Sequence, residues 1–144
     1  MTEISIIDFF DRYQRFFTEA LAGNLNASDL SVFYTSEFIT ATPAGVMMGK
    51  NDDTLKRNIV NGYAYYRAIG TKSMRVRNVR LSPIDDRHAV AHVAWTAVYA
   101  KDFQPDINIG FEVHYLMQES NGQIKIFGWV SGDEQALLRE RGVI

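Results

Sequence analysis

The stretch His88–Met117, with the sequence HAVAHVAWTAVYAKDFQPDINIGFEVHYLM, decides the fold of this chain. Its two halves, residues 88–100 and 107–117, each alternate between residues for one face and residues for the other, which is typical of β-strands. A hairpin centred near Phe103 would pair His92 with His114 and Trp95 with Phe111. The residues predicted to face the core are Ala89, Ala91, Val93, Trp95, Ala97 and Tyr99 in the first strand, and Ile107, Ile109, Phe111, Val113, Tyr115 and Met117 in the second.

The rest of the chain predicts helices before this pair of strands and further strands around it. Apolar residues at helical spacing indicate helices over about 4–22, 27–34 and 51–67, and the segment 37–49 indicates a short strand and a loop. Residues 74–81 and 124–131 indicate strands, and a short helix follows near the end. This order is typical of an α+β protein, and 144 residues are the size of one domain, 1–144.

The composition excludes several classes of function. A formal net charge of −2 provides no basic surface for nucleic acid or an anionic membrane. The absence of cysteine excludes disulfides, a thiolate nucleophile and a cysteine metal site. The first residues lack a signal-peptide pattern, and no run of about 18 apolar residues occurs, so we expect a cytoplasmic protein with no membrane contact. The chain also lacks a phosphate-binding glycine loop and the common hydrolase motifs.

Four short motifs occur in an order that resembles a known superfamily. They are Tyr13–Gly23 followed by Asn24 and Asp29-Leu30, then Thr42-Pro43-Ala44-Gly45, then Met48-Gly49-Lys50, and finally Asn121-Gly122-Gln123-Ile124. Over nearly its whole length the chain resembles the nuclear transport factor 2-like superfamily, which includes ketosteroid isomerase and the SnoaL-like cyclases. The resemblance implies N-terminal helices packed in the concave face of a strongly curved, mostly antiparallel sheet, the cystatin-type cone. It also implies an apolar cavity and a homodimer formed through the outer face of the sheet.

The catalytic positions of the relatives are not filled in the expected way. The position of the isomerase's aspartate base matches Thr42, which cannot abstract a carbon-bound proton. The position of its helix-1 tyrosine is closest to Phe16, with Tyr13 one turn earlier, and that of its strand aspartate falls near Val113. The Asp-Arg-Asp set of limonene epoxide hydrolase has no match either. We therefore expect no ketosteroid isomerase activity, whereas a tyrosine and histidine set like that of scytalone dehydratase stays open.

The inward aromatic residues predict a pocket for a small, largely apolar ligand, with no cofactor. The predicted lining is Tyr13, Phe17, Thr40, Thr42, Tyr63, Tyr66, Trp95, Phe111, Val113, Tyr115, Phe127 and Trp129. The register of the last strand has two alternatives, because a slip of one residue reverses every side chain. Matching Gly122 to the family turn places Phe127 and Trp129 inside, which we favour, whereas a strict two-residue Asn-Gly hairpin places Ile126 and Val130 there.

The opposite faces of the same strands predict the interface of a homodimer. The predicted interface residues are Val90, His92, Ala94, Val98, His114 and Leu116, which would otherwise expose apolar surface to water. A zinc site made of His92, His114 and Glu112 is a weaker alternative.

Three functions therefore compete: a ligand-binding dimer, a SnoaL-like isomerase, cyclase or dehydratase that uses tyrosine and histidine groups, and a dimeric protein-interaction module. His92 discriminates between them, because inside the pocket it favours an enzyme and outside it favours an interface.

Overall fold

A computed structural model describes residues 1–144 as four helices and six strands. The helices are α1 (Glu3–Leu21), α2 (Ala27–Ser31), α3 (Asp53–Ala68) and α4 (Glu134–Glu140). The strands are β1 (Tyr34–Thr42), β2 (Gly45–Lys50), β3 (Thr71–Pro83), β4 (His88–Lys101), β5 (Gln104–Ser120) and β6 (Gln123–Ser131). No helix is both long enough and apolar enough to cross a membrane.

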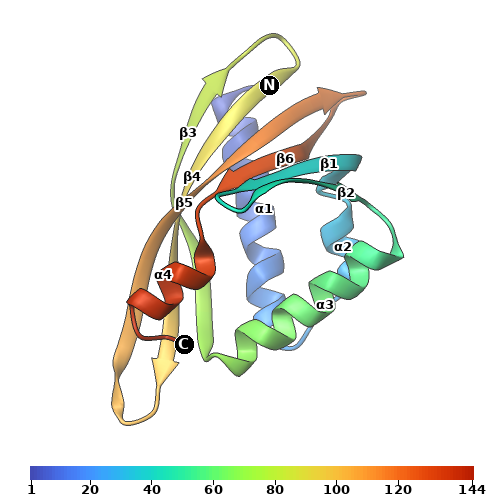
Figure 1. Ribbon diagram of the computed structural model, residues 1–144. Helices are drawn as coiled ribbons and strands as arrows, with labels where there is room; N and C mark the ends of the chain where they lie inside the picture. The colour runs from blue at the N-terminus through green and yellow to red at the C-terminus, as the bar shows by residue number, and fades with distance from the viewer.

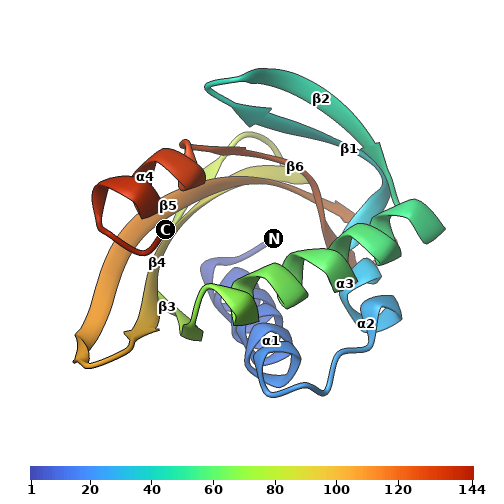
Figure 2. The same cartoon turned by 60° about the horizontal axis from the view of Figure 1, so that its bottom comes forward.

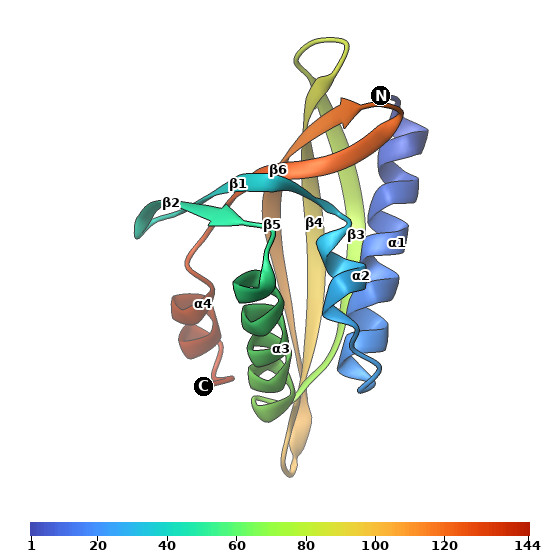
Figure 3. The ribbon, with the colours of Figure 1, turned by 90° about the vertical axis from the view of Figure 1, so that its right-hand side faces the viewer.

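The strands form one curved sheet in the order β2-β1-β6-β5-β4-β3. Only β1 and β6 run parallel, and every other neighbouring pair is antiparallel. The sheet arches over α1 and α3, which lie on its concave side, while α4 lies beside the lower half of β5 (Figures 1 and 2). In the side view of Figure 3, β1 and β2 cross the direction of β4 and β5, so the sheet is strongly twisted. The predicted α+β cone is therefore confirmed.

The first helix forms the centre of the core. Thr2 caps it in a capping box with Ser5, in which each side chain bonds the backbone N–H of the other residue. The buried residues of α1 include Ile6, Phe9 and Phe10, each at most 1% exposed. Full burial of such apolar side chains is the main favourable term in folding, so α1 is fixed against the sheet.

The region after α1 differs from the prediction. The helix expected over 27–34 ends at Ser31, and the expected short strand and loop is a hairpin of two strands, β1 and β2. Tyr34 begins β1 with its side chain buried in the core, so tertiary packing outweighs the local preference for helix. Gly45 closes the hairpin turn with φ of +134°, a conformation that favours glycine.

The central pair of strands has the predicted register. His92 is opposite His114 and Trp95 is opposite Phe111, and every second residue of β4 from Ala89 to Tyr99 is buried as predicted. Ala94, on the opposite face, is buried as well. The regular alternation of a long hairpin fixes this register because a slip would place the apolar face in water.

The last strand follows neither predicted alternative. Ser120 pairs with Gln123 across the tight turn, and this register leads to Met117 opposite Ile126. The next pair is Leu116 opposite Gly128, which leaves Phe127 as the extra residue of a β-bulge. Ile126 therefore faces the core, whereas Phe127 packs against His88 on the outer side.

Beyond the bulge the alternation resumes with the opposite phase. Trp129 pairs with Tyr115 and lies on the inner side, and Val130 faces outward. The favoured inward placement of Phe127 is wrong, and so is the alternative inward placement of Val130. The bulge is the physical reason that one residue of each alternative, Ile126 and Trp129, points inward.

Candidate ligand-binding cavity

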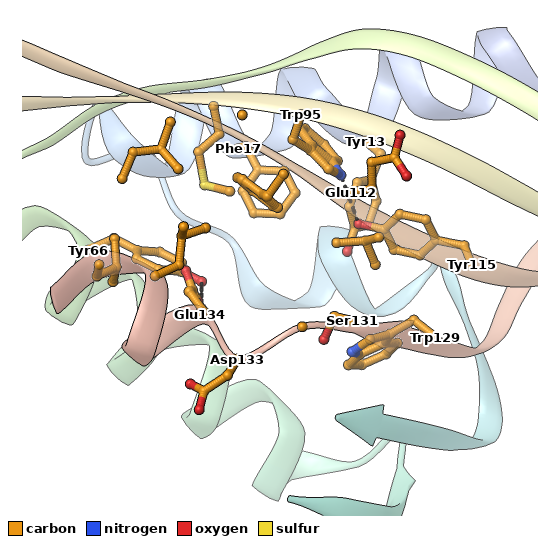
Figure 4. Close-up of a pocket in the computed structure, with 18 of the residues that line it drawn as sticks. Tyr13, Phe17, Tyr66, Trp95, Glu112, Tyr115, Trp129, Ser131, Asp133 and Glu134 are labelled. Atoms are coloured by element: carbon orange, nitrogen blue, oxygen red, sulfur yellow. Dashed lines mark hydrogen bonds between the residues drawn. The ribbon is translucent and has the colours of Figure 1, made fainter. Parts of the chain in front are cut away.

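A cavity of about 540 Å³ lies between the helices and the concave face of the sheet. Twenty residues line it, and 14 of them are hydrophobic. They come from α1, β1, α3, β3, β4, β5, β6 and α4, so the cavity is where most elements of the cone meet (Figure 4). This volume lies within the usual range for small-molecule sites, roughly 300–1,000 Å³.

Eight of the predicted lining residues lie around this cavity: Tyr13, Phe17, Tyr66, Trp95, Phe111, Val113, Tyr115 and Trp129. The cavity therefore gathers residues from positions 13 to 129, and the alternation of β4 and β5 accounts for four of them.

Four predicted residues do not line the cavity. Thr42 is exposed at the end of β1, and its hydroxyl accepts a hydrogen bond from the backbone N–H of Ala44 in the turn. Thr40 pairs with Trp129 in the sheet but does not reach the cavity. Tyr63 is buried in the core behind it, against Phe17, and Phe127 lies on the outer face because of the bulge.

Several lining residues were missed by the sequence analysis. Tyr34 was placed at the end of a helix, so its inward side chain was not considered. Tyr99 and Ile109 belong to the predicted inward faces of β4 and β5, and this pattern could have identified them. Glu134 and Leu138 come from α4, whose position over the cavity has no local signal in the sequence.

The inner end of the cavity carries a cluster of hydroxyl groups. The hydroxyls of Tyr13 and Tyr34 hydrogen-bond each other, and the indole N–H of Trp95 donates to the Tyr115 hydroxyl at 3.2 Å. Tyr13 and Tyr115 have ring centroids 6.0 Å apart, and both point their hydroxyl ends toward the same region in Figure 4. All four side chains are at most 6% exposed.

Burial raises the pKa of these tyrosines further above neutral pH. It raises the pKa of Tyr34 to about 12 and raises those of Tyr13 and Tyr115 further. Their hydroxyls are therefore hydrogen-bond donors under ordinary conditions, because the anionic form would be poorly solvated in the cavity. The sequence comparison placed a helix-1 hydroxyl position at Phe16, but Phe16 does not line the cavity. Tyr13, one turn earlier, supplies the hydroxyl from helix 1.

The other end of the cavity carries one inward carboxyl group. Glu134, the first residue of α4, accepts a hydrogen bond from the Tyr66 hydroxyl at 3.4 Å (Figure 4). Burial is the main cause of the raised pKa of Glu134, and the hydrogen bond from Tyr66 opposes it. The Asp133 side chain instead caps α4 by accepting from the backbone N–H of Ala136 at 3.0 Å.

The three histidines lie away from the cavity. His92 and His114 face the convex side of the sheet, where their Nδ1 atoms are 2.7 Å apart, and the Ser82 hydroxyl lies 2.9 Å from Nε2 of His92. One imidazole must donate and the other accept in this contact. No group of three or more potential metal ligands comes together anywhere in the chain. His92 therefore lies outside the cavity.

Two rows of residues cross the convex face from β2 to β3. The first is Met48, Ile39, Gly128, Leu116, Val90 and Ser82, and the second is Val46, Ala41, Val130, His114, His92 and Arg80. The predicted interface residues Val90, His92, His114 and Leu116 lie within these rows. Ala94 is already 7% exposed within the chain, so its contribution to an interface is small.

The most exposed apolar residues of the convex face were not predicted. They are Met48 at 79%, Val46 at 70%, Val130 at 45% and Ile39 at 42% exposure. These four residues lie at the β2, β1 and β6 end of the two rows. Val46 and Met48 were missed because the segment that forms β2 was expected to be a loop, whereas Ile39 and Val130 lie in segments that were predicted to be strands. We call these four residues, together with Leu116 and Val90, the convex apolar patch.

Comparison with known protein families identifies the family of this chain. Residues 2–134 match the model of a family described as NTF2-like protein (DUF6841). The chain belongs to this family. The match covers every element through β6, so the resemblance inferred from the four sequence motifs is confirmed at the level of the superfamily. No curated protein matches the chain in sequence.

Solved structures of NTF2-like and other proteins share the fold. An NTF2-like protein of unknown function from Shewanella oneidensis MR-1 has a TM-score of 0.68 at 12% identity, over 92% of this chain and 100% of that chain. The β subunit of the benzoate 1,2-dioxygenase from Burkholderia mallei has a TM-score of 0.67 at 14% identity, over 96% and 94%. Aln2 from a Streptomyces species has a TM-score of 0.65 at 12% identity, over 98% and 99%. At these identities the likeness establishes the fold alone.

Proposed function

We propose that this NTF2-like protein binds a small, largely apolar molecule in the cavity of the cone. The observation that carries the proposal is a cavity of about 540 Å³ in which 14 of 20 lining residues are hydrophobic. Apolar walls with a few oriented polar groups are the usual composition of a small-molecule site. The polar groups at the inner end of the cavity then select among apolar molecules by hydrogen bonding.

Counting hydrogen-bond donors at the inner end supports a ligand with an acceptor oxygen. Tyr13 and Tyr34 have two hydroxyl hydrogens between them, and their mutual hydrogen bond uses one. Tyr115 accepts from Trp95, but its own hydrogen has no acceptor in the protein. Two hydroxyl hydrogens in this buried cluster are therefore unused, and leaving buried donors unpaired costs free energy. A carbonyl or ether oxygen of a ligand would accept them.

We further infer that the functional form is a homodimer that associates through the convex face. The support is the convex apolar patch, whose most exposed members cross three neighbouring strands, β2, β1 and β6. Exposing such an apolar surface to water costs free energy. A second copy of the chain would remove the patch from water by packing against it. The dioxygenase relative is described as a β subunit, so in that protein this fold is part of an assembly.

An enzyme of the SnoaL-like type is the second candidate. The tyrosine hydroxyls at the inner end support it, because they are placed to polarise a carbonyl group. Against it, no histidine lines the cavity, and Thr42 is exposed outside it. Binding therefore has more support than acid–base catalysis by a tyrosine and histidine pair.

The proposal is tested with a probe that absorbs only weakly where tryptophan absorbs. The bicyclic ketone 2-decalone has an apolar body and one acceptor oxygen, and Trp95 would report its binding in the Trp129→Phe variant. We expect a saturable change in fluorescence. The matched control is Val113→Phe, which adds bulk to the cavity wall and should weaken binding. An unchanged fluorescence signal up to the solubility limit of 2-decalone would refute the proposal.

A further inference from the structure

Glu134 is the one carboxyl group that is directed into the cavity and has no charged partner. The chain has five ion pairs within 4.0 Å and a contact between His88 and Asp85, and Glu134 takes part in none of them. Its single hydrogen bond, from the neutral Tyr66 hydroxyl, is long at 3.4 Å. A carboxylate has about four acceptor positions, so most of the hydrogen-bonding capacity of Glu134 is unused by the protein.

No positive charge from the protein reaches the cavity. Its 20 lining residues include no lysine, arginine or histidine. The lining residues include two other acidic residues, Asp133 and Glu112, whose carboxyl groups are not directed into the cavity. The Asp133 side chain caps α4, and Glu112 is an exposed residue of the convex face, beside Ala94 in the sheet. An anionic ligand would therefore meet the Glu134 carboxylate with no compensating cation.

Two tyrosines line the same cavity as the carboxyl group of Glu134. The Tyr66 hydroxyl on α3 donates a hydrogen bond to it at 3.4 Å, and Tyr99 lines the cavity from β4. Nine of the 20 lining residues are aromatic in total. The faces of such rings attract cations, and the attraction is larger where water is excluded.

We propose that Glu134, with Tyr66 and Tyr99, forms a second polar subsite that takes the protonated amine of a ligand whose body is apolar. The subsite rests on the proposed function, since the apolar body occupies the same cavity. Glu134 as a whole residue is exposed, although neighbouring protein atoms partly desolvate its carboxyl group. The carboxyl group therefore stands at the mouth of the cavity, where an entering ligand reaches it. The ammonium group would hydrogen-bond the carboxylate while the tyrosine rings cover its remaining hydrogens.

A purely structural role for Glu134 predicts a different outcome. An acidic residue in the first turn stabilises a helix through its dipole, and Glu134 occupies that position in α4. Removing its charge would then lower stability without changing which probes bind. The ratio of affinities for charged and neutral probes therefore separates the two roles.

The test compares three decalin probes that differ in one group: 2-aminodecalin, 2-decalol and decalin-2-carboxylate. At pH 7.5 we expect the ammonium probe to bind at least about tenfold more tightly than the alcohol, as for a charge-assisted hydrogen bond, and the carboxylate to bind most weakly. Glu134→Gln keeps the size of the side chain and should abolish the preference for the ammonium probe over the alcohol probe. Glu140→Gln, on the same helix but outside the cavity, is the matched control and should keep the preference.

Equal binding of the ammonium and the alcohol by the unmodified protein would overturn the amine subsite and leave the proposed function intact. Persistence of the ammonium preference in Glu134→Gln would also overturn it. Failure of all three probes to bind would overturn both proposals together.

Discussion

The hydroxyl group of Tyr13 in α1 hydrogen-bonds that of Tyr34 in β1, and both are buried at the inner end of the cavity. The two residues are 21 positions apart in the chain, so this contact connects the central helix to the first strand. It also brings two phenol groups together where a ligand oxygen would arrive. The neighbouring Tyr115 completes a cluster in which the protein leaves two hydroxyl hydrogens without an acceptor.

Removing hydroxyls from this cluster should reduce the preference for a ligand oxygen. Tyr115→Phe deletes one unused hydrogen outright, so the affinity for 2-decalone should fall about fivefold, as for the loss of one neutral hydrogen bond. Tyr34→Phe should have a smaller effect, because Tyr13 keeps its own hydrogen. Titration calorimetry with 2-decalone and with 2-methylenedecalin, which lacks the oxygen, measures the preference. Tyr65→Phe, at an exposed tyrosine bonded to Gln135, is the control. Equal losses for both probes would contradict the assignment.

Phe111 should contribute less to stability than a packed core phenylalanine. It is half-buried and faces the cavity, whereas Phe10 is fully buried in α1. Phe10→Ala should lower the free energy of unfolding by about 3–5 kcal/mol, and Phe111→Ala by less than about 3 kcal/mol, because a ring beside a void loses fewer contacts. Urea denaturation of both variants measures the difference. Equal costs would indicate that the cavity is closed around Phe111.

The convex apolar patch should hold two copies of the chain together. Val130 is 45% exposed in one copy, so Val130→Asp should leave the monomer folded. In the dimer it would bury a carboxylate without a partner and raise the dissociation constant at least about a hundredfold. Sedimentation velocity at micromolar concentration should give a dimer for the unmodified chain and a monomer for the variant. Ile84→Asp, at an exposed residue in the loop between β3 and β4, should stay dimeric. A monomeric unmodified chain would contradict the prediction.

Acidification should destabilise the protein through His92. Burial lowers the pKa of His92 below 6.5, with the Arg80 and His114 charges acting in the same direction and Glu112 opposing them. As the pH falls, the His92 imidazole is therefore protonated in the unfolded state before it is protonated in the folded state. The contribution of neutral His92 to the free energy of unfolding is present above about pH 6.5, and it is lost as the pH drops toward the pKa of His92 in the folded state. Denaturant unfolding between pH 7.5 and 5 measures this loss.

A variant of His92 separates its contribution from other acid effects. His92→Gln should flatten the pH dependence of the unfolding free energy between pH 7.5 and 5. A slope that survives in His92→Gln would assign the effect to other groups.

The strongly alternating strands could be predicted from sequence, and the irregular ones could not. The pairing of Trp95 with Phe111 follows from a period of two that continues for many residues. The bulge at Phe127 follows from contacts with another strand: a Cβ atom at Gly128 would lie 2.7 Å from the carbonyl oxygen of Ile39 in β1. Glycine permits this close approach, but only the folded structure shows which backbone comes near.

The candidate site divides in the same way. Trp95, Phe111 and Tyr115 could be predicted because their strands are regular. Tyr34 was missed because its segment favours helix locally while core packing makes it a strand. Glu134 was missed because its approach to the cavity depends on how α4 folds back over the sheet, and a short helix carries no sequence signal for its partner.

The ligand site in the cavity is tested by calorimetric titration of 2-decalone into the purified protein. We expect saturable binding at one site per chain and much weaker binding by Val113→Phe, with a cooperative thermal unfolding transition showing that this variant is folded. Absence of measurable heat, or binding that is unaffected by Val113→Phe, would contradict the claim that the cavity is the site.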